Sequence, residues 1–272
     1  MIVDLDAVTR AIADIAATEI VPRYGKLSED AIGTKSGPQD FVTEADHAAE
    51  DALARVLSDI YPAAKFVGEE RAASDPDLVS GLDSDDAFWI VDPVDGTRNF
   101  IEQRDEFGTI VALVEGREIR AGWVYAVLQQ KCAVASLGDG AAWDGQALSA
   151  LEPPAGPLRG QRAIGSFKEP WKSLLPDRMR EAFETEPTRC SAFAYLRMAQ
   201  GHRDFGLFSR SHPWDHAAGV LILREIGGVA TYLDTGKPYT AVDTLGRPLL
   251  VSGSQDRFDR VRETLMEGVD VI

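Results

Sequence analysis

The sequence contains little of what several protein classes require. Only two of its 272 residues are cysteines, Cys132 and Cys190, which is too few for a disulfide framework and does not match zinc-finger spacing. No apolar run reaches the roughly 18 residues of a membrane-spanning helix, and the N-terminus lacks the pattern of a secretory signal. From these absences we expect a cytoplasmic protein that does not associate with a membrane.

Positive charge is also scarce. The chain carries 28 Lys and Arg against 44 Asp and Glu, a formal net charge of -16. This balance argues against binding to nucleic acid or to an anionic membrane surface. An anionic substrate would be repelled unless cations reversed the local field, and bound divalent metals would do so. With 44% hydrophobic residues, the chain can form a core in one large or two small domains.

The most informative segment runs from Trp89 to Phe100, with the sequence Trp-Ile-Val-Asp-Pro-Val-Asp-Gly-Thr-Arg-Asn-Phe. A buried-strand pattern ends at Asp92 and Asp95, which are joined through a proline that stiffens the turn. Carboxylate oxygens suit Mg²⁺, which leaves other coordination positions to water and substrate phosphate. Gly96 and Thr97 follow with backbone N–H groups that suit a phosphate. The segment therefore predicts a metal site joined to a phosphate site.

Four acidic residues, Asp46, Asp92, Asp95 and Asp215, also have a simpler structural interpretation. Asp-Pro-x-Asp-Gly is common in turns, so these five residues alone do not decide between a turn and a metal site. Asp215 follows Pro213 and Trp214 where a helix should begin, and in isolation an N-cap is the better interpretation. Thr43-Glu-Ala-Asp46 fits a capping box, although Asp46 could still direct its second oxygen at a neighbouring hydroxyl.

The segment from Trp89 to Phe100 resembles the Trp-x-x-Asp-Pro-x-Asp-Gly-Thr-x-Asn-Phe signature of the inositol monophosphatase family, magnesium-dependent and often lithium-sensitive phosphatases. Three further segments resemble family motifs in the same order, so the resemblance covers roughly residues 5 to 255. These segments are Lys35 followed by Asp40-Phe-Val-Thr-Glu-Ala-Asp46, Phe66-Val-Gly-Glu-Glu70, and Trp214-Asp215-His-Ala-Ala-Gly219 with Gly227-Gly228.

The resemblance implies a role for each matching residue. Glu69, Asp92 and the backbone carbonyl of Val94 would hold one Mg²⁺, while Asp92, Asp95 and Asp215 would hold a second. Up to three ions are expected, Mn²⁺ could replace Mg²⁺, and Li⁺ would inhibit.

The remaining implied roles concern the phosphate and the attacking water. Gly96 and Thr97 would donate backbone N–H groups to the phosphate. The Thr97 hydroxyl, paired with Asp46, would orient and help to deprotonate an activated water, with assistance from Glu69. Glu70 and Lys35 would lie next to the metal ligands without binding the ions themselves.

The family resemblance also implies the fold and assembly. We expect a layered α/β/α/β/α sandwich of the inositol monophosphatase and fructose-bisphosphatase type, with the site between two halves and a homodimeric assembly. The Pro-rich run 151–157 is the best candidate linker. The expected division is residues 1–150, an α+β half with most metal ligands, and 151–272, an α/β half with Asp215 and the segment that determines substrate specificity.

Hydrophobic periodicity supplies the expected elements. The first helix should end at Pro22. Other helices are expected at 43–60, 172–183, 193–201, 215–226 and 255–267. Strands are expected at 107–114 and 119–126, which should pair as a hairpin, and at 131–136, 162–167, 203–209, 229–233 and 248–252.

The substrate is a small phosphorylated metabolite whose identity stays open. Family members that prefer myo-inositol phosphate have a glutamate seven residues before Asp215, where this chain has Phe208, and a phenyl ring cannot accept hydrogen bonds from ring hydroxyls. Arg210 offers a cation for a second anionic group or a surface ion pair, and Ser191 and Arg189 are further candidates to line the pocket. Sugar phosphates, histidinol phosphate, fructose bisphosphate and nucleotide phosphates all fit this pattern.

Two other function classes fit the sequence less well than a phosphatase. A regulatory or scaffolding protein could keep the fold without catalysis, but it would have no need of the full set of acidic groups and Thr97. A simple Ca²⁺- or Mg²⁺-binding module would explain the carboxylates but not the Gly96-Thr97 pair. With only four histidines, metal activation of water is the consistent chemistry, and His212 and His216 are expected to cap or pack rather than to bind a metal.

Overall fold

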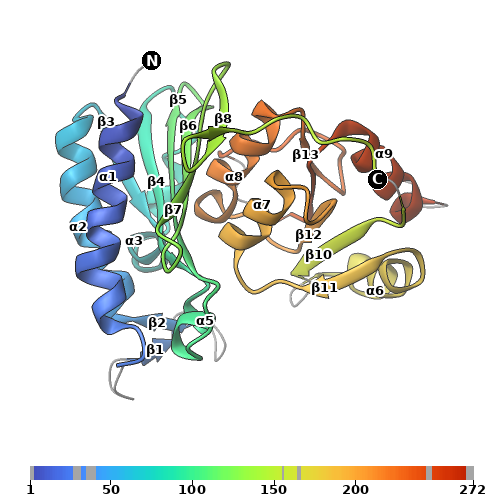
Figure 1. Cartoon of the computed structure of the whole chain (residues 1–272), viewed down its shortest axis with the longest axis horizontal. Helices are drawn as coiled ribbons and strands as arrows, with labels where there is room; N and C mark the ends of the chain where they lie inside the picture. The colour runs from blue at the N-terminus through green and yellow to red at the C-terminus, as the bar shows by residue number, and fades with distance from the viewer. Residues whose placement is uncertain are drawn as a thin grey trace.

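A computed structural model of the chain describes residues 3–26, 32–34, 41–154, 156–163, 167–242 and 247–267. Lys35 and Asp40 lie outside these residues. Figure 1 shows five layers: a helical layer with α1 (Leu5–Ile15) and α2 (Glu44–Ile60), a sheet, a middle helical layer, a second sheet, and an outer layer with α6 (Trp171–Ala182) and α9 (Gln255–Met266). The expected α/β/α/β/α sandwich is confirmed.

The first sheet has seven described strands in chain order, β3 to β9. Only β3 and β4 are parallel, and the others form an antiparallel meander that contains the expected hairpin and the strand after it. The short strands β8 and β9 were not expected. The strands are β3 (Ala64–Gly68), β4 (Ala87–Asp95), β5 (Gly108–Glu115), β6 (Glu118–Ala126), β7 (Lys131–Ser136), β8 (Gly140–Trp143) and β9 (Gln146–Ala147).

The second sheet has five described strands in the order β11-β10-β12-β14-β13. The strand expected at 162–167 begins earlier, at Arg159, and is described as far as Ala163, while residues 164–166 lie outside the described part of the chain. Strand β11 was not expected because its sequence, Glu-Thr-Glu-Pro, is too polar to be recognised as a strand. The strands are β10 (Arg159–Ala163), β11 (Glu184–Pro187), β12 (Phe205–Phe208), β13 (Val229–Tyr232) and β14 (Leu249–Ser252).

Two helices, α7 (Ser191–Ala199) and α8 (Pro213–Glu225), lie between the sheets. Strand β4 is buried along its whole length, so alternate side chains enter two different cores. Phe88 and Ile90 pack in the core that contains α7 and α8, whereas Trp89 and Val91 pack in the core with α1 and α2. A third core joins the second sheet to α6 and α9.

The remaining described elements are short. The first helix continues past α1 as a π-helical turn at Ala16–Ile20 and a 3-10 turn at Val21–Arg23, which contains Pro22. None of the described helices has the length and apolar character needed to span a bilayer. The other elements are β1 (Ile32–Thr34), β2 (Phe41–Thr43), α3 (Glu69–Ser74), α4 (Asp77–Ser80) and α5 (Thr97–Ile101).

Candidate active site

A β-bulge at the end of β4 brings two acidic residues to the same side of the strand. Asp92 pairs with Ile110 and Asp95 with Gly108, so three steps along β4 match two along β5. In a regular strand, residues three apart point to opposite faces, and one extra residue reverses that relation. The Thr109 hydroxyl donates to the carbonyl of Pro93 at 2.9 Å and holds the bulge.

Asp215 reaches the same place from the second half of the chain. One carboxylate oxygen from each of Asp92, Asp95 and Asp215 lies within 4.8 Å of the other two. The alternative role for Asp215 as an N-cap is wrong, because α8 begins two residues earlier, at Pro213, and His212 occupies the N-cap position. Proline suits the first helical position, where its missing N–H has no intrahelical partner to lose.

The environment of Asp95 favours a bound cation. Its Oδ2 accepts hydrogen bonds from the Cys190 thiol at 2.8 Å and from the Ala192 N–H at 2.6 Å. Burial nevertheless raises the pKa of Asp95 to about 6, and these donors offset only part of that effect. The negative charge of Glu69 raises this pKa further. A divalent cation would remove the repulsion between these acids, and an oxygen-only donor set is the kind that Mg²⁺ prefers.

The N-terminus of α2 carries the second part of the site. Asp46 Oδ2 accepts from the Thr43 N–H at 2.8 Å and from its hydroxyl at 2.6 Å, which confirms the capping box. Asp46 Oδ1 lies 3.2 Å from the Thr97 hydroxyl, so Asp46 also has the expected second contact. The same hydroxyl lies 3.0 Å from the carbonyl of Val94. Thr97 is therefore placed between the β4 bulge and α2.

Gly96 connects β4 to α5 in a conformation that favours glycine. Its φ of 86° is left-handed, and a Cβ there would lie 3.1 Å from both the Cys190 Cβ and the Glu106 carbonyl oxygen. The bend turns the chain so that Thr97 begins a short helix beside Asp92 and Asp95. Gly96 and Thr97 thus occupy the place beside the carboxylates that a phosphate would need.

Comparison with known proteins identifies the type of protein that carries this site. The model of the inositol monophosphatase family matches residues 3–261. The inositol-1-monophosphatase of Bacillus subtilis is 29% identical over 220 residues, 78% of this chain and 79% of that protein. A fructose-1,6-bisphosphatase/inositol-1-monophosphatase of Thermotoga maritima is 30% identical over 210 residues, 74% of this chain and 75% of that protein.

The chain belongs to the inositol monophosphatase family. Members of this family are magnesium-dependent phosphatases, and the protein is a phosphatase of the inositol monophosphatase and fructose-1,6-bisphosphatase type.

Solved structures of the same type share its fold. An inositol monophosphatase of Thermotoga maritima superposes with a TM-score of 0.78 at 24% identity, covering 98% of this chain and 99% of that one. A staphylococcal inositol monophosphatase-1, solved as a lithium chloride inhibitory complex, has a TM-score of 0.80 at 20% identity over 97% and 94% of the two chains. An inositol monophosphatase/NADP phosphatase solved with NADP and Ca²⁺ has the same score and identity over 97% and 95%.

In this member of the family, a buried glutamate that the sequence did not reveal positions α3. Glu50 on α2 is 2% exposed, and its carboxylate accepts from the N–H of Glu70 at 2.8 Å and of Arg71 at 3.1 Å. A Cβ on Gly68 would lie 2.2 Å from Glu50 Oε2. Glu50 lies one helical turn after Asp46, and this i, i+4 spacing was the only signal in the sequence.

Glu69 and Asp215 open onto a large cleft at one side of the site, with a volume of about 1170 Å³. Glu70 and Arg210 also line it, whereas Ser191 is not among the lining residues. The Ser191 N–H instead lowers the pKa of Asp95.

Phe208 is 2% exposed and stacks on Tyr195 at 5.9 Å between ring centroids. Phe208 therefore belongs to the core and does not line the cleft.

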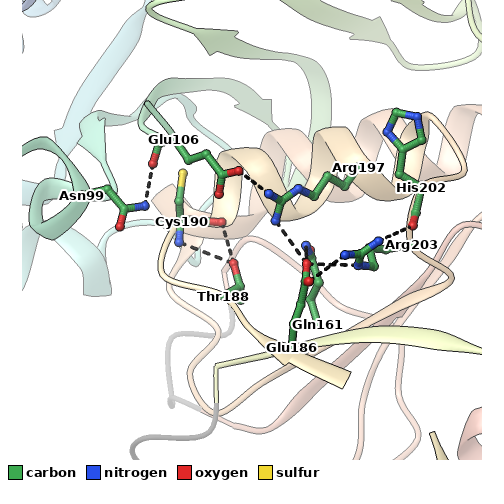
Figure 2. A network of polar contacts seen from close by, with 9 residues as sticks. All are labelled: Asn99, Glu106, Gln161, Glu186, Thr188, Cys190, Arg197, His202 and Arg203. Carbon is green, nitrogen blue, oxygen red and sulfur yellow. Dashed lines mark hydrogen bonds and ion pairs between the residues drawn. The ribbon is translucent and has the colours of Figure 1, made fainter. Parts of the chain in front are cut away.

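A polar network ties the chain after α5 to the second half (Figure 2). Arg197 on α7 bonds both Glu106 and Glu186, and Arg203 donates to Glu186 at 2.6 and 3.0 Å. These arginines lower the pKa of Glu186, with Arg203 the main cause. Asn99 donates to the Glu106 carbonyl at 2.7 Å, so the network reaches back to α5.

The other basic candidates have ion-pair partners outside the cleft. Arg98 lies 2.8 Å from one oxygen of Glu102, and Arg189 lies 3.2 Å from the other. Arg98 therefore forms a partly exposed ion pair with Glu102.

The two histidines near the second motif pack as expected. His216 is 1% exposed, and its Nε2 lies 3.0 Å from the Arg210 carbonyl. Because a carbonyl can only accept, Nε2 carries the proton, and Nδ1 accepts from the Tyr195 hydroxyl at 2.9 Å. Burial lowers the pKa of His216 to about 3. The His212 ring stacks on Trp214 at 5.0 Å with 5° between the planes.

Proposed function

We propose that the protein hydrolyses a small phosphorylated metabolite at the site formed by Asp92, Asp95, Asp215 and Thr97. The observation that carries this proposal is the approach of Asp215 to within 4.8 Å of two acids from the other half of the chain. Repulsion makes such a group costly without a cation, and two or three Mg²⁺ ions would be held by these acids with Glu69 and the Val94 carbonyl.

When bound, the magnesium ions would withdraw charge from the phosphate and make water more acidic. The chain's own groups supply position and proton transfer. The backbone N–H groups of Gly96 and Thr97 would orient the phosphate beside the acids. The Thr97 hydroxyl would accept a hydrogen bond from the attacking water and donate its own proton to Asp46, with which it is already in contact.

Hydrolysis then proceeds as an in-line displacement. The water oxygen bonds to phosphorus while the ester P–O bond breaks, and the proton lost by the water goes towards Thr97 and Asp46. The departing alkoxide takes a proton from solvent. Glu69, which lines the cleft, would help to orient the attacking water.

We further propose how the protein is organised and where it acts. Residues 1–150 and 151–272 would form the two halves, because the first sheet ends at Ala147 and the second begins at Arg159. A homodimer is proposed by likeness to the family. The cytoplasm is proposed because both cysteines are unpaired thiols, which a reducing compartment maintains. Light scattering and cell fractionation test these points.

The function is tested by measuring phosphate release from a panel of monoesters while Mg²⁺ is titrated. We expect saturable dependence on Mg²⁺, competition by Li⁺, and some activity with Mn²⁺. Neighbours solved with a lithium soak, inositol monophosphate or 2'-AMP support this choice of reagents. Absence of Mg²⁺-dependent release from every ester would overturn the proposal.

A further inference from the structure

Apart from Glu69 and Asp215, the residues that line the cleft favour one chemical class of phosphate ester. Its volume of about 1170 Å³ exceeds the roughly 300–1,000 Å³ of typical small-molecule pockets, so it has room for more than a small sugar phosphate. Glu69 and Asp215 mark the end nearest the proposed phosphate site.

Aromatic rings form part of this wall. Trp171, at the start of α6, and the stacked pair His212 and Trp214, at the start of α8, all line the cleft. Flat rings stack on such side chains, as nucleic-acid bases do on aromatic residues. A polyol such as inositol instead needs polar acceptors, and Phe208 provides none because it is buried against Tyr195.

Three cations line the same cleft of an otherwise acidic protein. Lys168, Arg210 and Arg247 contribute to the lining. Within the described part of the chain, neither the Lys168 ammonium nor the Arg210 guanidinium forms an ion pair. Arg247 is held in place, with Nε 3.8 Å from Asp234 and its guanidinium 5.7 Å from the centroid of the Tyr232 ring.

Hydrogen bonds fix the backbone of the segment that carries Arg210, His212 and Trp214. Buried His216 donates to the Arg210 carbonyl, and the Arg247 N–H donates to the Ser211 hydroxyl at 3.2 Å. The Arg210 and Arg247 backbones are therefore fixed to the same turn as the His212–Trp214 pair. A preorganised arrangement of this kind lowers the entropy cost of ligand binding.

We propose that the cleft selects a phosphomonoester whose alcohol carries both a flat aromatic ring and a second anionic group. The ring stacks on the Trp171 and His212–Trp214 wall, and the second anion pairs with Arg210 and its neighbouring cations. This inference rests on the proposed function, because the hydrolysed phosphate is assigned to the three-aspartate end.

Four esters separate the two recognition elements. Adenosine 3′,5′-bisphosphate carries both ring and second anion, adenosine 3′-monophosphate only the ring, fructose 1,6-bisphosphate only the second anion, and glycerol 2-phosphate neither. We expect kcat/KM to rise roughly 10-fold with each element, the order of a single stacking or charge-assisted contact. Myo-inositol 1-phosphate should behave like glycerol 2-phosphate.

Two variants test which residues recognise the aromatic ring and the second anionic group of the substrate. Trp171→Ala should lower the ratio of kcat/KM for adenosine 3′-monophosphate over glycerol 2-phosphate about 10-fold. Arg210→Gln should lower the ratio for fructose 1,6-bisphosphate over glycerol 2-phosphate by a similar factor. Lys172→Ala and Arg180→Gln, exposed positions on α6 that do not line the cleft, are the matched controls and should leave both ratios unchanged.

The outcomes distinguish this inference from the function on which it rests. Equal kcat/KM for the four esters, or a clear preference for myo-inositol 1-phosphate, overturns the inference while Mg²⁺-dependent hydrolysis stands. Ratios that the Trp171 and Arg210 variants leave unchanged overturn it as well. No Mg²⁺-dependent release from any ester, glycerol 2-phosphate included, overturns the proposed function itself.

Discussion

Asp95 combines two properties that conflict in the absence of a metal. It is buried, which disfavours its charge, and it faces two other carboxylates, which disfavours that charge further. Its hydrogen bonds to Cys190 and Ala192 fix the orientation of the carboxylate. The side chain is therefore held ready for a cation at a cost to the metal-free fold.

We predict that Asp95→Asn abolishes most activity without unfolding the protein. Turnover should fall by orders of magnitude because one ligand oxygen is lost. In the metal-free protein the native pKa of about 6 exceeds the ordinary aspartate value of 3.8, so this carboxyl costs stability as pH rises through that interval. The metal-free variant should therefore be more stable than the parent above pH 6, by up to about 3 kcal/mol. Phosphate release and urea unfolding measure the two effects.

Asp59→Asn, at an exposed position on α2, is the control for this substitution and should change neither quantity. Near-normal turnover in Asp95→Asn would remove Asp95 from the metal site.

A second prediction at this scale concerns His216 and acid stability. Its native pKa of about 3 lies below the ordinary histidine value of 6.5, so only the unfolded chain gains this proton between those values. Stability is therefore lost as pH falls below 6.5, at about 1.4 kcal/mol per pH unit. His216→Gln keeps a donor for Arg210 and an acceptor for Tyr195 but does not titrate.

The unfolding free energy of the parent relative to His216→Gln should therefore drop by about 2 kcal/mol between pH 6.5 and 5. Denaturant unfolding at both pH values measures this difference, and a constant difference would contradict the assigned cause.

Among the elements, α3 depends on a contact with α2 that determines where Glu69 lies. The Glu50 carboxylate receives two N–H groups at the start of α3, and Gly68 leaves room for it. Burial raises the pKa of Glu50, and the two N–H groups with the nearby Arg71 oppose that effect. Any side chain at position 68 would have to displace either the carboxylate or the helix.

Gly68→Ala should therefore shift α3 and misplace Glu69. We expect the Mg²⁺ concentration for half-maximal activity to rise about 10-fold, the order seen when residues that support metal ligands are changed. Gly156→Ala is the matched control, because nothing lies within 4 Å of a Cβ at that position and its φ is not positive. An unchanged Mg²⁺ response in Gly68→Ala would show that α3 does not position a ligand.

The elements also show which features can be predicted from sequence. The long helices and the β5–β6 hairpin follow from hydrophobic periodicity, and the signature segments identify Asp92, Asp95 and Asp215. Strand β11 is too polar for that approach and forms because it pairs with β10. The roles of Glu50 and Cys190 depend on contacts between elements that are distant in sequence, which no local pattern encodes.

At the scale of the whole molecule, the proposed metal site joins the two halves of the chain. Asp92 and Asp95 belong to the first sheet, Asp215 lies in the first turn of α8 in the middle layer, and Arg197 links Glu106 of the first half to Glu186 of the second. Partly exposed ion pairs of this kind contribute little energy, so bound cations should have the larger effect on stability.

We predict that Mg²⁺ stabilises the folded protein well beyond the effect of ionic strength. At 100 times the dissociation constant, one ion adds about 2.7 kcal/mol, which corresponds to a rise in Tm of roughly 5–10 °C for a chain of this size. Differential scanning fluorimetry with Mg²⁺, and again after EDTA, measures this rise.

Sodium chloride at matched ionic strength is the control, because it screens the net charge of -16 without binding the acids. Equal shifts with both salts, or an undiminished shift in Asp215→Asn, would argue against an ion between the halves.

Because of the bulge in β4, the number of residues between Asp92 and Asp95 determines whether both carboxylates lie on the same face of the sheet. Other amino acids can replace Pro93 and Val94 as long as both positions are kept. Deleting either residue would turn one carboxylate to the opposite face of the sheet, into the hydrophobic core that contains Trp89. Protein engineers who diversify positions 93 and 94 must therefore keep the number of residues between the two acids unchanged.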